Sequence, residues 1–76
     1  DFDIYPNPAA KLINIVSSNT IKTIIMYNLT GEKVLELHPS QKKSNIITSG
    51  LTQGVYLLKI ISSNGLIFTK EIIISK

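Results

Sequence analysis

Hydrophobic and polar side chains alternate with a period of two along most of the chain, which indicates β-strands rather than helices. Ile, Val and Thr together supply 23 of the 76 residues, and their branched side chains suit the pleated surface of a sheet. Turn-forming residues recur at intervals of about 8–12 residues, a spacing that is typical of all-β sandwiches. The pattern therefore predicts an all-β fold without a helix.

The alternating segments and the turns between them predict seven strands in one antiparallel β-sandwich. The strands are expected at residues 2–5, 11–17, 21–29, 33–37, 44–48, 55–62 and 66–75. The polar run at residues 17–20 predicts a turn between the second and third strands. Gly31 and the run at residues 63–65 predict hairpin turns, because glycine adopts a positive φ without strain.

Prolines interrupt the pattern after the first strand. Pro6 and Pro8 flank Asn7, and a proline cannot donate a ladder hydrogen bond. Each proline also fixes its own φ near −65°. The segment Pro6-Asn7-Pro8 is therefore predicted to form a rigid corner.

The alternation also predicts which side chains share a face. We expect the following groups to lie together: Ile13 with Ile15, Ile24 with Met26, and Tyr56 with Leu58 and Ile60. Leu51 is expected to point inward from a loop. Several strands are apolar on both faces, including residues 72–74, and an uncovered apolar face would be adhesive. Either these strands are central in the sandwich or an outer face meets a partner, and we favour the first interpretation.

Composition limits what the chain can be. A length of 76 residues allows one domain, and the absence of cysteine excludes a disulfide scaffold and thiol chemistry. No apolar run approaches the ~18 residues of a spanning helix, so no membrane span is expected. The chain has neither an initial Met nor a signal peptide, and we expect residues 1–76 to be a single domain excised from a larger secreted protein.

The charges predict no nucleic-acid partner. The formal net charge is +3, but the eight lysines are scattered and only Lys42 and Lys43 are adjacent. Nucleic-acid binders usually cluster basic residues with aromatic partners. We therefore expect no nucleic acid among the partners of this domain.

Residues suited to catalysis are scarce, and we predict no catalytic residue, metal site or cofactor. His38 is the only histidine, and it is expected in a solvated loop without a nucleophile beside it. Asp1 and Asp3 have the spacing that opens a calcium loop, but the required Gly and Glu are missing. A glycan-binding surface usually exposes a row of aromatic residues, whereas this chain has no Trp and three Tyr.

Four sequence blocks, taken together and in this order, resemble a known family of secretion signals. They are Tyr5-Pro6-Asn7-Pro8-Ala9, a turn at residues 28–34 that contains Gly31, the run Leu51-Thr52-Gln53-Gly54-Val55-Tyr56, and the final block Lys70-Glu71-Ile72-Ile73-Ile74-Ser75-Lys76. The chain is similar, over essentially its whole length, to the type A C-terminal sorting domain of type IX secretion systems in Bacteroidetes-type bacteria.

This resemblance implies an Ig-like sandwich of seven strands that ends a secreted cargo protein. The cargo enters the periplasm, and the domain directs it through an outer-membrane translocon with its shuttle proteins. A sortase-like peptidase then removes the domain, so that the cargo reaches the cell surface or the medium. We expect the translocon to read an element within Lys70 to Lys76, since an edge strand there could be recognised by strand addition.

Two other functions remain open at this stage. One is a β-sandwich module that binds surface carbohydrate, and the other is an adhesion or spacer domain of a surface protein. A sorting signal must end its parent protein, whereas these modules can occupy any position. Gly31 and Gly54 are expected to serve their turns rather than to contact a receptor.

Overall fold

The computed structural model describes residues 2–7 and 11–75, and this part of the chain contains six strands and no helix. The strands are β1 (Phe2–Tyr5), β2 (Leu12–Tyr27), β3 (Lys33–Leu37), β4 (Gln41–Ile47), β5 (Gly54–Ser62) and β6 (Ile67–Ile74). All pairings are antiparallel, so the predicted all-β antiparallel fold is confirmed. The predicted count of seven strands is wrong. Among the described residues, no helix is long and apolar enough to cross a membrane.

The count differs because β2 unites the strands expected at residues 11–17 and 21–29. The polar run between them forms no turn and continues the strand. Its backbone finds partners on neighbouring segments: the Thr20 carbonyl accepts from the amide of Ser63 at 2.8 Å, and the Ile21 carbonyl accepts from the amide of Ser40 at 3.0 Å. Because these partners satisfy the backbone, polar side chains alone do not end the strand.

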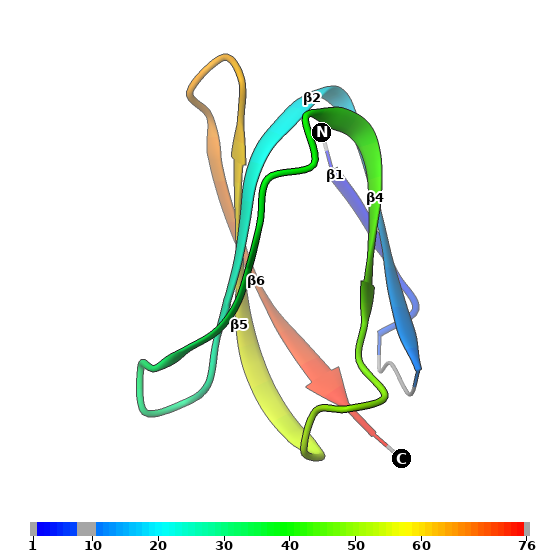
Figure 1. Cartoon of the computed structure of the whole chain (residues 1–76), viewed down its shortest axis with the longest axis vertical. Helices are drawn as coiled ribbons and strands as arrows, with labels where there is room; N and C mark the ends of the chain where they lie inside the picture. Colours follow the sequence, from blue (N-terminus) through cyan, green and yellow to red (C-terminus); the bar gives the residue numbers. More distant parts are fainter. Residues whose placement is uncertain (1, 8–10, 76) are drawn as a thin grey trace.

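β2 is the central strand of the sheet, since four other strands pair with it. The strand order is β1-β2-β5-β6, and β3 and β4 also pair with β2. The first half of β2 pairs with β1 and β4, and the second half pairs with β3 and β5. Figure 1 shows β2 arching over at the top of the view, so that the two halves of the sheet face each other. β4 starts at Gln41, earlier than the expected residue 44, because Gln41 still pairs opposite Ile21 of the arch.

A β-bulge in β2 shifts the alternation where the strand changes partners. Ile21 lies opposite Ser62 and Thr23 lies opposite Ile61, so β2 carries one extra residue at Lys22. An extra residue of this kind reverses which side chains face inward beyond it. Odd-numbered positions of β2 are buried before the bulge, and even-numbered positions are buried after Thr23.

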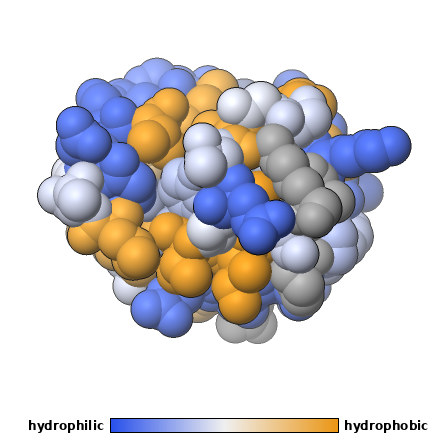
Figure 2. Space-filling model, turned by 90° about the horizontal axis from the view of Figure 1, so that it is seen from below, coloured by the Kyte–Doolittle hydropathy of each residue, from blue (hydrophilic) through white to orange (hydrophobic). Residues whose placement is uncertain are grey.

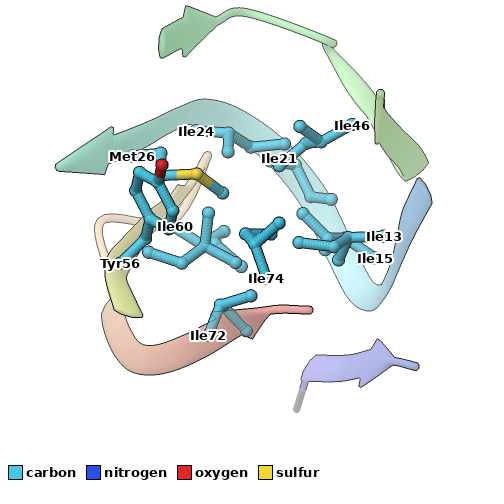
Figure 3. Close-up of a cluster of buried hydrophobic side chains, with 11 residues drawn as sticks. Ile13, Ile15, Ile21, Ile24, Met26, Ile46, Tyr56, Ile60, Ile72 and Ile74 are labelled. Atoms are coloured by element: carbon cyan, nitrogen blue, oxygen red, sulfur yellow. The ribbon is translucent and has the colours of Figure 1, made fainter. Parts of the chain in front are cut away.

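The core lies between the two halves of the folded sheet, as Figure 3 shows. Its eleven buried hydrophobic side chains are Ile13, Ile15, Ile21, Ile24, Met26, Ile46, Tyr56, Leu58, Ile60, Ile72 and Ile74. The groups predicted to share a face are therefore confirmed. Leu51 is partly buried and packs against this cluster, as its predicted inward orientation requires.

The outer face of β5 and β6 is open among the described residues. Leu57, Ile67 and Ile73 are 39%, 61% and 46% exposed, respectively. The interpretation that strands with two apolar faces are covered on both sides is therefore wrong here. Figure 2 views the molecule from its lower end, where hydrophobic surface is divided into patches by hydrophilic side chains.

Candidate recognition site

The predicted recognition block at Lys70 to Lys76 divides into two groups in β6 and the residue after it. Ile72 and Ile74 are fully buried and belong to the core. Lys70, Glu71, Ile73 and Ser75 are exposed, whereas Lys76 lies outside the described residues. Only the exposed members and the backbone can contact another protein. This division follows from the two-residue period of a strand.

Asn7 connects the corner after β1 to this terminal strand. Its side-chain oxygen Oδ1 accepts a hydrogen bond from the Ile73 amide at 3.0 Å, and its Nδ2 donates to the Glu71 carbonyl at 3.4 Å. Two of the motif blocks, separated by more than 60 residues of sequence, thus meet in space. Pro6 and Asn7 are exposed at this corner, the Tyr5–Pro6 peptide is cis, and Pro8 lies outside the described residues.

The sequence pattern does not indicate this contact, because Asn7 stands between two prolines and the pattern predicts only a corner there. The one signal in the sequence for such a contact is the presence of a polar residue at a corner where prolines restrict the backbone. Its partner strand could not be identified without the fold, since β1 and β6 are not hydrogen-bonded neighbours in the sheet.

β1 and β6 are the two ends of the strand order, and side chains bridge the seam between them. The rings of Phe2 and Phe68 stack with their centroids 5.1 Å apart and their planes at 30°. Asn7 makes the second connection, toward the Ile73 end of β6. The seam therefore holds β1 beside β6 without strand pairing among the described residues.

Tyr56 explains the spacing of the block that runs from Leu51 into β5. Its ring is buried, and its hydroxyl donates to the Thr52 carbonyl at 2.5 Å. Gly54 has a φ of +156° at the start of β5, in a region that residues with side chains rarely adopt. Leu51 also donates its amide to the Thr48 carbonyl at 3.0 Å. These contacts shape the loop, so Gly54 and Tyr56 serve the fold here.

Asn28 organises the turn that contains Gly31. Its Oδ1 accepts from the Thr30 amide at 3.1 Å and from the Glu32 amide at 2.9 Å. Gly31 donates its amide to the Asn28 carbonyl at 3.0 Å and has the predicted positive φ, +87°. The local hydrogen bonds account for this block without a ligand.

His38 makes contacts that the sequence did not predict. Its Nδ1 lies 3.3 Å from the Thr23 hydroxyl, and its Nε2 lies 2.9 Å from a carboxylate oxygen of Glu36. A hydroxyl, an imidazole and a carboxylate in this order resemble a hydrolytic triad in outline. However, Thr23 is only 8% exposed. The Thr23 side chain therefore offers little accessible surface to a substrate in this arrangement.

Glu36 is also paired with Lys33, whose Nζ lies 2.6 Å from its other carboxylate oxygen. The hydrogen bond from Lys33 lowers the pKa of Glu36, and the charge of Lys33 acts in the same direction. The hydrogen bond to Glu36 raises the pKa of Lys33, and the negative charge of Glu36 acts in the same direction. Both groups are open to water, so the pair contributes little to stability.

The remaining candidate chemistry is sparse in residues 2–7 and 11–75. No three His, Cys, Asp or Glu residues lie close enough together to hold a metal ion in this part of the chain, and Asp1 lies outside it. Of the tyrosines, Tyr5 is 51% exposed and Tyr56 is buried, while Tyr27 is partly buried in a different strand. The tyrosines thus form no exposed aromatic row of the kind that binds glycans.

Comparison with known proteins addresses the family directly. A search of curated proteins finds no match to this chain. The family described as the secretion system C-terminal sorting domain matches residues 3–75, which include the corner at Asn7 and β6. The chain therefore belongs to the family of C-terminal sorting domains of the type IX secretion system.

Proposed function

We propose that residues 1–76 belong to a single C-terminal sorting domain of a longer secreted protein. In this proposal the cargo precedes the domain and crosses the periplasm, and the domain engages the outer-membrane translocon and its shuttle proteins. A sortase-like peptidase then removes the domain. The observation that carries the proposal is the family match over residues 3–75. The junction of two motif blocks through Asn7 and β6 supports it from the structure.

We further propose that the translocon contacts the exposed side of the terminal strand. Lys70, Glu71, Ile73 and Ser75 are accessible there, and Ile73 is an apolar side chain that is 46% exposed. Ile72 and Ile74 act indirectly, since they hold β6 against the core. Lys76 extends the block in sequence and is included in the proposal.

We also propose that the domain is a variant of the Ig-like sandwich that the family resemblance implies. The bond from the Tyr56 hydroxyl to the Thr52 carbonyl supports this view, because Ig-like domains contain a similar tyrosine at the entry of a core strand. In this variant the arched β2 would take the place of two separate strands.

A reporter fused to the N-terminus of the domain tests the proposed function in a host with a type IX system. We expect the reporter in the medium or on the surface with the wild-type domain, and in the periplasm without it. The double variant Lys70→Ala/Ile73→Thr should reduce export while the purified domain stays folded. Lys42→Ala/Ile47→Thr is the matched control, because Lys42 is exposed and Ile47 is 68% exposed on β4.

Each result has a distinct meaning. Failure of the wild-type domain to export the reporter would refute the sorting function. Equal export by the β6 and β4 double variants would show that these side chains of β6 are not read.

A further inference from the structure

β6 pairs with β5 on one side and is the last strand in the order β1-β2-β5-β6. β6 pairs with no second strand among the described residues, although Asn7 bonds to its backbone and Phe2 stacks on its Phe68. The bonds to Asn7 show that the amide of Ile73 and the carbonyl of Glu71 point away from β5. In an antiparallel strand, the backbone amide and carbonyl groups of every second residue point to the same edge. The register between β5 and β6 has no shift that would interrupt this alternation. The backbone groups of Thr69 and Ile67 therefore face the same edge.

Asn7 makes the hydrogen bonds that one residue of an added strand would make. In a parallel ladder, each bonded residue makes two hydrogen bonds to the neighbouring strand. Its amide donates to the carbonyl of one residue, and its carbonyl accepts from the amide of the residue two positions later in that strand. The Asn7 carboxamide bridges Glu71 and Ile73 in this way. Figure 1 shows β1 and β6 both running from the top of the view to the bottom, so Asn7 follows a strand that is parallel to β6.

We propose that the β6 edge from Ile67 to Ile73 accepts an extended strand from the secretion machinery, and that Asn7 is an internal competitor at one end of this edge. The proposal rests on the proposed sorting function. We expect the incoming segment to present its main-chain amides in parallel register, because the Asn7 carboxamide meets the Glu71 carbonyl and the Ile73 amide in that pattern. It should also carry apolar side chains, since Ile67 and Ile73 are exposed beside the edge.

A second copy of the domain fits this edge less well. Two copies related by a two-fold axis would pair their β6 strands antiparallel, whereas the Asn7 bonds have the parallel pattern. A pairing centred on Lys70 or Glu71 would also place like charges opposite each other, which is unfavourable.

The competitor role of Asn7 is tested by NMR titration of the ¹⁵N-labelled domain. The probe is an acetylated, amidated peptide of alternating Val and Thr, and the same peptide with alternate amides N-methylated is its control. We expect shifts in the amides of Ile67, Thr69, Glu71 and Ile73 with the first peptide only. Asn7→Ala should bind about tenfold more tightly, equivalent to about 1.4 kcal/mol, whereas Asn45→Ala on β4 should match the wild type.

Several results of this titration would overturn the proposal. Equal affinities of Asn7→Ala and the wild type would remove the competitor role. Shifts confined to other strands, or equal binding of the N-methylated peptide, would remove the strand-addition site. Dimerisation of Asn7→Ala without peptide, measured by light scattering, would assign the edge to a second copy.

The export assay tests the same edge in the cell through Thr69. Thr69→Pro removes an amide that faces this edge, and proline is tolerated on an edge strand at such a position. Thr69→Val keeps the amide and is the matched control. We expect Thr69→Pro to lose at least tenfold in export while its circular dichroism remains that of the wild type, and Thr69→Val to be exported normally. Normal export of folded Thr69→Pro would overturn strand addition and leave the sorting function intact, whereas loss of wild-type export would refute the sorting function itself.

Discussion

Replacing Tyr56 by Phe tests whether this motif residue serves the fold or the receptor. The ring is 7% exposed, so Phe can fill the same space in the core. The change removes only the hydroxyl that donates to the Thr52 carbonyl at 2.5 Å. A typical intramolecular hydrogen bond contributes about 0.5–1.5 kcal/mol net. Thr52 is exposed, so water can replace the lost donor, and we expect a loss of about 1 kcal/mol.

Thermal and urea unfolding followed by circular dichroism measure this loss. For a domain of this length, 1 kcal/mol corresponds to a decrease in Tm of about 4–8 °C. Tyr27→Phe is the matched control, because Tyr27 is only partly buried and its ring lies outside the buried core cluster. Its stability should change by less than about 0.5 kcal/mol. Equal stabilities of the two variants would refute the structural role that we assign to the Tyr56 hydroxyl.

The same variant separates stability from recognition in the export assay. If the domain has a stability of about 5 kcal/mol, near the low end for natural domains, a loss of 1 kcal/mol leaves about 99.9% of the molecules folded. The Tyr56 ring is only 7% exposed and its hydroxyl is assigned to the fold, so Tyr56→Phe should be exported at the wild-type level. Lost export by a folded Tyr56→Phe domain would show that the hydroxyl takes part in recognition.

Three further changes test other parts of the structure. Thr48→Val should raise the free energy of unfolding by about 1 kcal/mol in urea titration, because the buried Thr48 hydroxyl has no hydrogen-bond partner among the described residues. Gly31→Ala should lower it by about 1–2 kcal/mol, because Ala is strained at a φ of +87° although nothing lies within 4 Å of its added Cβ. Lys33→Ala should raise the pKa of Glu36 toward its ordinary value, as measured by NMR titration, since Lys33 is the main cause of the lowered pKa. Because the pKa of Glu36 is lowered in the folded state, its ionised carboxylate stabilises the fold above the unfolded-state pKa, and this stabilisation is lost as the pH falls through the folded-state pKa. Lys33→Ala should therefore weaken the dependence of stability on acid pH.

The sequence predicted most of the fold because alternation is a local property. The faces that carry Ile24, Met26, Leu58 and Ile60 follow directly from a period of two. The strand count failed because the end of a strand depends on its partners. The polar run at residues 17–20 looks like a turn until the chain at Ser40 and Ser63 supplies hydrogen bonds to β2.

The candidate site was predicted in part, and the missing part is non-local. The block Lys70 to Lys76 comes from the family resemblance, and its role in recognition stays a prediction, whereas the structure shows which of its described residues are buried and which are exposed. The role of Asn7 could not be predicted, because the partner groups of its carboxamide are 64 and 66 residues away in the sequence. Likewise, the contact between Thr23 and His38 depends on how β2 passes beside the end of β3.

The structure also links the accessible edge of β6 to the folding of the whole domain. Ile72 and Ile74 reach the core only when β6 pairs with β5, and this pairing directs the amides of Thr69 and Ile73 outward. Asn7 reaches the edge only when β1 is paired with β2. In an unfolded chain these amides have no common direction, so a partner that adds a strand would find no edge. A receptor that reads the β6 edge would therefore distinguish a folded sorting domain from an unfolded one without any separate contact to the core.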